Sequence, residues 1–263
     1  MTNNNKSEQE LYIERCRREN FLIKIARISV LLLFLGLWEL ASALSFIDPF
    51  FFSSPSRICL LFIDMCKNFE IFIHTWITLY ETILSFIIVN VLSILVSVIM
   101  LSFERFSKIV EPYLVILNSL PKSALAPLII VWLGTGSRTI IVAGISVALF
   151  GSIINLYTGF LQVDEEQRKL ITTLGGSKKD QLTKVIIPSS VPIILSNMKV
   201  NIGLSLVGVI IGEFLAARQG LGYLIIYGSQ VFQLDLLIMS IVILCIIALG
   251  LYQSIDRLEK NFQ

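Results

Sequence analysis

The chain has 263 residues, of which 55% are hydrophobic and 15% are charged, and its net charge is +2. A soluble domain would carry about 25% charged residues, so much of the surface is expected to face lipid. The small net charge gives no reason to expect a nucleic-acid partner. Four cysteines and one histidine follow no metal-ligand spacing, so neither a metal site nor a catalytic cluster is expected.

Six apolar runs are long enough to cross a membrane, which takes about 20 residues in a helix. These runs are too long for strands and lack the alternation of a membrane barrel. The sequence therefore predicts an all-α integral membrane protein with six transmembrane helices. The expected spans are residues 28–47, 80–103, 111–133, 139–161, 189–212 and 234–254.

The first span follows a polar, basic segment, residues 1–27. Its apolar run exceeds a normal signal-peptide core and lacks a clear cleavage site, so we expect it to be retained. Residues 48–75 are interrupted too often by charges to span. A helix starting near Ser56 is expected there, with one face on the membrane or on other spans. His74 and Glu81 are expected at the interface, and residues 219–233 are expected to form a short external helix before the last span.

The distribution of Lys and Arg sets the orientation. With the N-terminus inside, residues 1–27, 104–110, 164–184 and 256–263 are cytoplasmic and hold fifteen basic residues, whereas the external loops hold four. Both termini are therefore expected in the cytoplasm, with residues 1–27 as an N-terminal segment and 256–263 as a tail. The transmembrane domain is residues 28–255.

The polar stretch at residues 164–188 is too long for a simple turn between spans. Asp164 can cap a first helix, "VDEEQRKLITTL", and Gly175 and Gly176 can end it in the left-handed conformation. Ser177 can cap a second helix, and Pro188 marks the return to the membrane. A helix–glycine–helix unit projecting into the cytoplasm is expected, and a partner protein is expected to bind its tip.

The stretch from "VDEEQRKLITTLGGSKKDQLTKVIIP" to "EFLAARQGLGYLI", with "LWELAS", "SSPSRI" and "LPKSALAPLIIVWLGTGSRT" upstream, resembles permease subunits of bacterial ATP-binding-cassette (ABC) importers. It is most similar to the branch that takes up nitrate, sulfonates and taurine. The resemblance covers roughly residues 28–258. Gly175 and Pro188 match the family's loop motif, whereas its Glu-Ala-Ala positions are here Lys169, Leu170 and Ile171.

The resemblance implies a type I ABC importer permease fold and a coupling helix that docks onto an ATPase. It also implies a homodimer or heterodimer of permeases, two ATPase subunits that use ATP and Mg²⁺, and an extracytoplasmic solute-binding protein. "GTGSRT" and "GGSKKDQLT" do not match a phosphate-binding loop, so this chain is expected to bind no cofactor and not to be an enzyme. The expected coupling-loop residues are Lys169, Leu170, Ile171, Leu174, Gly175, Gly176, Ser177, Lys178, Gln181 and Pro188.

Ionisable side chains within spans are costly and mark candidate pathway residues. Lys122 lies between two prolines in a region of expected broken helix, where freed carbonyls need partners. Beside Asn118, Ser119 and Ser123, it either lines a pathway for an anion or pairs with a carboxylate or a helix end. Lys199 either packs against a carboxylate or contacts substrate. Glu213 is either part of an outer gate or a solvated helix end. Three glycines in the fifth span are expected to allow close helix approach, and these are Gly203, Gly208 and Gly212.

The expected substrate is a small solute, either a sulfonate-, nitrate- or taurine-like anion or a pyrimidine- or flavin-like vitamin precursor. An alternative is an ion-coupled secondary transporter that works without an ATPase. That class needs intramembrane ion sites in matched halves of the chain, whereas Glu39, Glu81 and Glu213 lie near span ends or in the first span and no repeat is visible.

Overall fold

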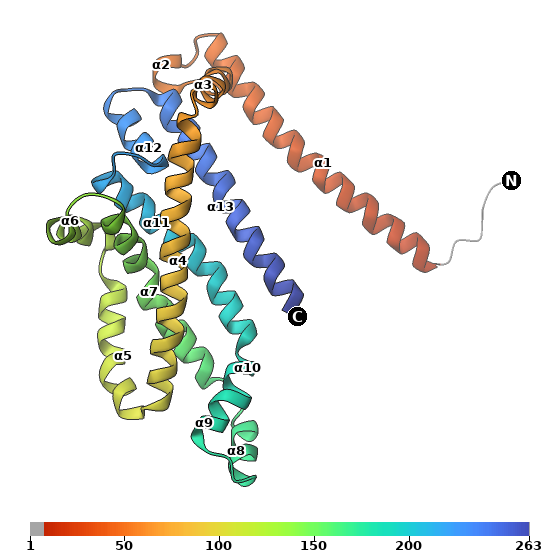
Figure 1. Ribbon diagram of the computed structural model, residues 1–263. Helices are drawn as coiled ribbons and strands as arrows, with labels where there is room; N and C mark the ends of the chain where they lie inside the picture. The colour runs from red at the N-terminus through yellow and green to blue at the C-terminus, as the bar shows by residue number, and fades with distance from the viewer. Residues whose placement is uncertain (1–7, 263) are drawn as a thin grey trace.

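The computed structural model describes residues 8–262, and every regular element within that range is helical. The first helix, α1 (Glu8–Ala43), is a continuous helix of 36 residues. It runs away from the other helices in Figure 1 and contacts α3 at its upper end. There the Glu39 carboxylate accepts hydrogen bonds from the backbone N–H and the hydroxyl of Ser56, at 3.0 and 2.8 Å.

The segment between the first two spans contains the helix that the sequence predicted near Ser56. A single turn, α2 (Pro49–Phe52), precedes α3 (Pro55–Lys67). The hydroxyl of Ser54 caps α3 by accepting from the backbone N–H of Arg57. The guanidinium of Arg57 lies 3.0 Å from the carboxylate of Asp235, and this ion pair joins α3 to the last helix.

The second span is longer than predicted, and the third span contains a sharp bend. Helix α4 (Glu70–Ser102) begins ten residues before the predicted start of its span. The third expected span, residues 111–133, is broken between its prolines, and α5 (Glu104–Ser119) and α6 (Lys122–Leu133) meet there at an angle of 98°. The bend has a local cause: Pro121 has no N–H and forces the residue before it into an extended conformation.

The remaining elements follow the predicted order. They are α7 (Ser137–Leu161), α8 (Glu165–Thr173), α9 (Lys178–Gln181), the π-helix η1 (Leu182–Ile186), α10 (Ile187–Ser189), α11 (Val191–Ala216), α12 (Leu221–Gln230) and α13 (Leu234–Phe262). In the described part of the chain, five helices are long and apolar enough to cross a membrane, and the bent α5–α6 pair makes a sixth candidate. The all-α architecture of membrane helices is confirmed.

The centre of the bundle is formed by α4, α7 and α11. Two of the three glycines in α11 allow a close approach to α7. A methyl group added at Gly208 would lie 2.8 Å from the Cα of Gly144, and one added at Gly212 would lie 2.9 Å from the Cα of Ile140. Gly203 has no neighbour within 4 Å of such a group, so the expectation of close packing at Gly203 is wrong within this chain.

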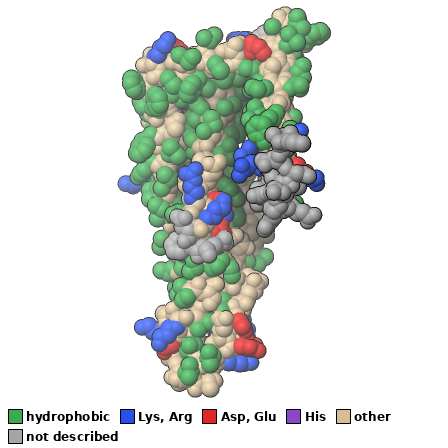
Figure 2. All heavy atoms as spheres, turned by 90° about the vertical axis from the view of Figure 1, so that its right-hand side faces the viewer, with side chains coloured by type: hydrophobic (Ala, Val, Ile, Leu, Met, Phe, Trp, Pro, Cys, Tyr) green, Lys and Arg blue, Asp and Glu red, His purple; other side chains and the backbone are tan. Residues whose placement is uncertain are grey.

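The two ends of the bundle differ in character. Helices α2, α3 and α12 gather at the upper end, and α8 and α9 project from the lower end (Figure 1). Figure 2 shows positive and negative side chains together at the lower tip, whereas hydrophobic side chains cover much of the surface above it. The projecting end therefore carries charged side chains of both signs, and further charged side chains lie at the middle and the upper end of this face (Figure 2).

Candidate coupling loop and membrane-embedded polar groups

The loop between α7 and α11 is built around two capped helices. The side chain of Asp164 accepts from the backbone N–H of Glu166 at 2.9 Å and so caps α8. At the other end Gly175 has a φ of +78°, and the N–H of Gly176 donates to the carbonyl of Ile171 at 2.8 Å. Both features were predicted from the sequence, and the left-handed glycine ends the helix as expected.

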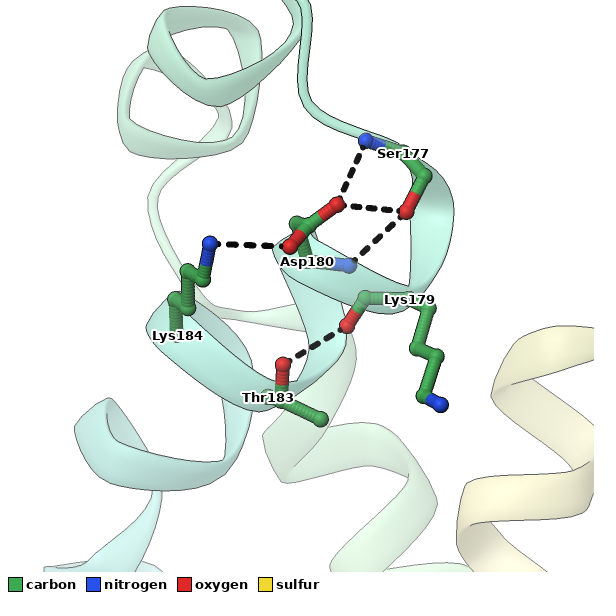
Figure 3. A network of polar contacts seen from close by, with 5 residues as sticks. All are labelled: Ser177, Lys179, Asp180, Thr183 and Lys184. Atoms are coloured by element: carbon green, nitrogen blue, oxygen red, sulfur yellow. Dashed lines mark hydrogen bonds and ion pairs between the residues drawn. The ribbon is translucent and has the colours of Figure 1, made fainter.

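The second helix begins at Ser177 with a reciprocal cap. The Ser177 hydroxyl accepts from the backbone N–H of Asp180, and the Asp180 carboxylate accepts from the backbone N–H of Ser177 at 2.9 Å. Lys184 lies 2.9 Å from the other carboxylate oxygen (Figure 3). The Ser177 hydroxyl and the Lys184 ammonium hold the pKa of the Asp180 carboxyl well below its ordinary value, because both interactions favour the ionised form.

The two loop helices are joined to each other and to the bundle. The side-chain amide of Gln181 donates to the hydroxyl of Thr172 at 2.6 Å, which links α9 to α8. At the base of the loop Phe160, Val163 and Ile186 are buried in one apolar cluster with residues of α4 and α11. A movement of the tip would therefore be passed to the membrane helices through packed contacts.

Pro188 occupies the first turn of a helix, as the sequence predicted. It lies in α10, directly after the π-helix η1, in which the N–H of Ile187 donates to the carbonyl of Leu182. Proline has no N–H to donate back along the helix, and a π-turn shifts the neighbouring bonds by one residue. Single π-turns of this kind are frequent at functional sites.

The tip of the loop exposes apolar and ion-paired side chains. Leu174 is 75% exposed and Leu170 is 58% exposed. Lys169, which stands where the related permeases have a glutamate, pairs with Glu165 one turn earlier at 3.1 Å. The loop therefore presents leucine side chains beside a neutralised charge pair.

Lys122 is engaged at a helix end. Its ammonium donates to the carbonyls of Leu117 and Asn118, at the C-terminus of α5, and lies 5.6 Å from the centre of the Phe150 ring. A cation at a helix C-terminus is favourable because it meets free carbonyls and the negative end of the helix dipole. Ser119 bonds the carbonyl of Val115 in its own helix, and the neighbouring Ser123 is exposed.

Lys199 is paired with carboxylates on another helix. Its ammonium contacts Asp256 at 2.5 Å and also contacts Glu259, both on α13. Asp256 pairs in addition with Lys260 at 2.7 Å. Lys199 therefore has a carboxylate partner, the alternative to substrate contact, and this pairing ties α11 to the end of α13.

Glu213 is fully buried, so its interpretation as a solvated helix end is wrong. Its carboxylate accepts from the hydroxyl of Thr78 at 2.6 Å and from the backbone N–H of Gly222 at 2.5 Å. The carboxyl group of Glu81 lies beside it and is also fully buried among the helices. His74 accepts a bond from the N–H of Gly220 at 2.9 Å, which fixes the turn before α12.

A seam of neutral polar side chains between α4, α7 and α11 was missed by sequence reasoning. The amide of Asn201 donates to the side-chain oxygen of Asn90 and to the hydroxyl of Ser152, both at 2.9 Å. The amide of Asn197 donates to the same hydroxyl at 2.7 Å. A signal for this seam is present in the sequence, because Asn90, Asn197 and Asn201 stand inside otherwise apolar runs.

Comparison with known proteins identifies the class to which this arrangement belongs. Residues 89–262 match the family model described as "Binding-protein-dependent transport system inner membrane component", and the chain belongs to this family. It is thus a multi-pass inner-membrane protein and a permease subunit of the ABC importer class.

Individual relatives agree with this class. A probable ABC transporter permease protein of Haemophilus influenzae is 30% identical over 87% of this chain and 92% of the relative. The formylaminopyrimidine transport permease protein ThiX of Halalkalibacterium halodurans is 29% identical, over 73% of this chain and 76% of the relative. A putative aliphatic sulfonates transport permease protein, SsuC of Bacillus subtilis, is 25% identical over 86% and 82%.

The fold is shared with solved transporters. A chain of the MetNI methionine ABC transporter, in an inward-facing conformation, superimposes with a TM-score of 0.65 at 17% identity, covering 75% of this chain and 98% of that one. These comparisons confirm the family and branch predicted from the sequence.

Proposed function

We propose that this chain forms part of the translocation pathway of an ATP-driven importer and receives its driving force through residues 164–188. Two permease chains, identical or paired with a related one, would each dock onto an ATPase subunit that hydrolyses ATP with Mg²⁺. A solute-binding protein would deliver the substrate to the opposite face. Both termini and the loop would lie in the cytoplasm, with residues 28–255 as the transmembrane domain.

The projecting loop carries this proposal. It combines an exposed leucine tip with two capped helices and a base packed into α4, α7 and α11. Exposed leucine side chains at the end of a projecting helical loop suit docking into a groove of a partner protein. In the proposed importer the energy would come from that partner. The coupling contact would involve Lys169, Leu170, Ile171, Leu174, Gly175, Gly176, Ser177, Lys178, Gln181 and Pro188.

Two substrate classes remain open at this level. The relatives named for formylaminopyrimidine and for aliphatic sulfonates are of similar identity to this chain. The transported solute is therefore proposed to be a small compound of one of these two kinds, a vitamin-like heterocycle or a small anion.

Co-purification tests the proposal. Tagged chain extracted gently from the membrane should bring down an ATPase with a phosphate-binding loop. Truncation of the tip by Leu174→Ala should weaken that association about tenfold, as expected when a contact worth about 1.4 kcal/mol is lost. Leu60→Ala is the matched control, because Leu60 is 68% exposed on α3 at the other end of the bundle.

The opposite result would favour the alternative transporter class. A chain that purifies alone, remains folded and transports solute in the absence of ATP would replace this proposal with ion-coupled transport. Equal loss of the ATPase in both leucine variants would remove the loop from the contact while leaving the class of protein unchanged.

A further inference from the structure

A groove of about 480 Å³ lies between α7 and α11, at the ends of these helices that adjoin the coupling loop. Its size is within the range of about 300–1,000 Å³ that is usual for small-molecule sites. Three of its polar residues lie at the end of α7 and are spaced three and four residues apart: Asn155, Thr158 and Gln162. Residues at these spacings share one face of a helix. Ser196 and Asn197 face them from α11.

The position of these side chains requires a polar environment. Asn155 lies within α7, nearly two turns before its last residue, and it and Thr158 are exposed. An amide exposed to hydrocarbon loses its hydrogen bonds with water at a cost of several kcal/mol. This face of α7 and α11 therefore meets water or a polar surface and not lipid tails.

Asn197 supplies an unused hydrogen-bonding group at the wall of the groove. The residue is 5% exposed, and its side-chain nitrogen donates to the hydroxyl of Ser152. Its side-chain oxygen has no hydrogen-bond partner among the described residues. A buried acceptor of this kind is costly unless a donor reaches it, and a molecule in the groove can supply that donor.

The groove offers no charge to a ligand. None of its lining residues is ionisable. The two lysines within the membrane helices are committed elsewhere, Lys199 to carboxylates of α13 and Lys122 to the C-terminus of α5. An anion drawn from water into this groove would lose its hydration without gaining a cation, whereas carboxamides and hydroxyls provide both donors and acceptors.

We propose that this groove is the point at which the transported solute contacts the membrane domain, and that the solute is an uncharged molecule with both hydrogen-bond donors and acceptors, as in an aminopyrimidine. The proposal rests on the proposed function and chooses between its two substrate classes. Asn155 and Asn197 recognise the solute, and the groove excludes small anions such as sulfonates. Its closeness to the coupling loop places the contact where a movement of the ATPase changes its shape.

Water access to the groove is measured first, in the complete transporter. The four native cysteines are replaced, and Asn155→Cys is treated with a membrane-impermeant maleimide in vesicles that expose both faces. Ile246→Cys is the control, because Ile246 is 63% exposed on the apolar surface of α13. We expect rapid labelling at position 155 and none at 246. Equal protection of both positions in an active transporter would overturn the proposal.

Uptake then tests the substrate class. Proteoliposomes with permease, ATPase and binding protein receive radiolabelled formylaminopyrimidine or ethanesulfonate. Only the pyrimidine should accumulate, and Asn155→Ala should reduce its uptake about tenfold, the effect of losing about 1.4 kcal/mol of recognition. Ser146→Ala, a polar truncation on α7 outside the groove whose hydroxyl bonds its own helix, should leave uptake unchanged.

The outcomes separate this inference from the proposed function. Three outcomes would overturn the assignment of the groove as the solute site and leave the importer function intact. They are uptake of ethanesulfonate, failure to carry either probe while the binding protein still stimulates ATP hydrolysis, and uptake that is unchanged in Asn155→Ala. A different result would support the groove as the solute site but contradict the importer function. In that case the pyrimidine is taken up without the ATPase, and its uptake still falls in Asn155→Ala.

Discussion

Gly175 ends the first helix of the coupling loop through its backbone and not through its packing. Its φ is +78°, and a methyl group added there would meet no atom within 4 Å. The next residue is different, because a methyl group on Gly176 would lie 2.5 Å from the Cγ2 of Ile171 and 2.9 Å from its carbonyl oxygen. The adjacent glycines therefore serve two separate purposes, a left-handed turn and a close contact.

The conformation of Gly175 leads to a prediction about coupling. Gly175→Val should strain the turn by about 1–2 kcal/mol, because a side chain with Cβ is crowded in the left-handed region. Transport per ATP hydrolysed should fall while the amount of protein in the membrane stays constant. Gly175→Asn is the control, since asparagine tolerates this conformation. If valine and asparagine behaved alike, the backbone angle would not matter for coupling.

Asp180 gives the loop a defined dependence on pH. Hydrogen bonds from Ser177, together with Lys184, lower the pKa of the Asp180 carboxyl in the folded loop below its ordinary value of 3.8. The stabilisation is therefore complete above that value and is lost as the pH falls through the folded-state pKa. At neutral pH the loop has the full benefit of the carboxylate.

Hydrogen exchange of residues 177–184 measures this effect. The extra protection of the parent over Asp180→Asn should be constant from pH 7 to about pH 5 and should begin to shrink below the ordinary aspartate pKa. Asp164→Asn is the comparison, because Asp164 also caps a helix but makes no reciprocal cap. Protection that increased towards acid pH would contradict the assignment of Asp180 as an ionised partner.

The burial of the carboxyl groups of Glu81 and Glu213 could not be predicted from the sequence. Glu81 and Glu213 are far apart in the chain and stand near the ends of apolar runs, where a carboxylate normally reaches water. Their burial depends on α12, which folds back so that the N–H of Gly222 meets Glu213. No local pattern encodes that return, whereas the caps at Asp164 and Ser177 depend on near neighbours and were predicted.

At the scale of elements, the contact between α7 and α11 is set by small residues. Gly208 faces Gly144 and the carbonyl of Ala143, and Gly212 faces Ile140. Without a hydrophobic driving force between helices in lipid, association depends on such close packing. Gly203 lies on the same helix with open space around it and provides an internal control.

A pair of alanine substitutions tests this packing. Gly208→Ala should destabilise the bundle by about 1–3 kcal/mol, because the added methyl group meets backbone atoms that cannot move aside. Gly203→Ala should be neutral or stabilising by up to about 1 kcal/mol, the difference in helix propensity. Thermal unfolding in detergent measures both. Similar stability of the two variants would mean that the helices separate easily at Gly208.

The bend between α5 and α6 shows which part of an element can be read from sequence. The sequence predicts a span at residues 111–133 with a helix break near Pro121, but it does not give the angle of that break. The 98° turn depends on Pro121 and on Lys122, which folds back onto the carbonyls that the break leaves free. Composition and the prolines thus locate the segment and its break, whereas the angle of the break is given only by the structure.

At the scale of the whole molecule, two ends of opposite character imply an orientation. The loop α8–α9 projects from one end, and α2, α3 and α12 close the other (Figure 1). Fifteen basic residues lie in segments 1–27, 104–110, 164–184 and 256–263, and positive residues favour the cytoplasmic side. The projecting loop should therefore lie on the same side of the membrane as both termini.

The native cysteines allow a direct test of this orientation. Chains that retain only Cys16, in α1, or only Cys59, in α3, are compared with a chain whose single cysteine is Leu174→Cys. An impermeant maleimide should label Cys59 in intact cells, because α3 lies at the external end, and should label Cys16 and position 174 only after the membrane is opened. Labelling of Cys16 and position 174 from opposite sides would show that an odd number of segments crosses the membrane between them, and the loop could then no longer share a compartment with the N-terminus.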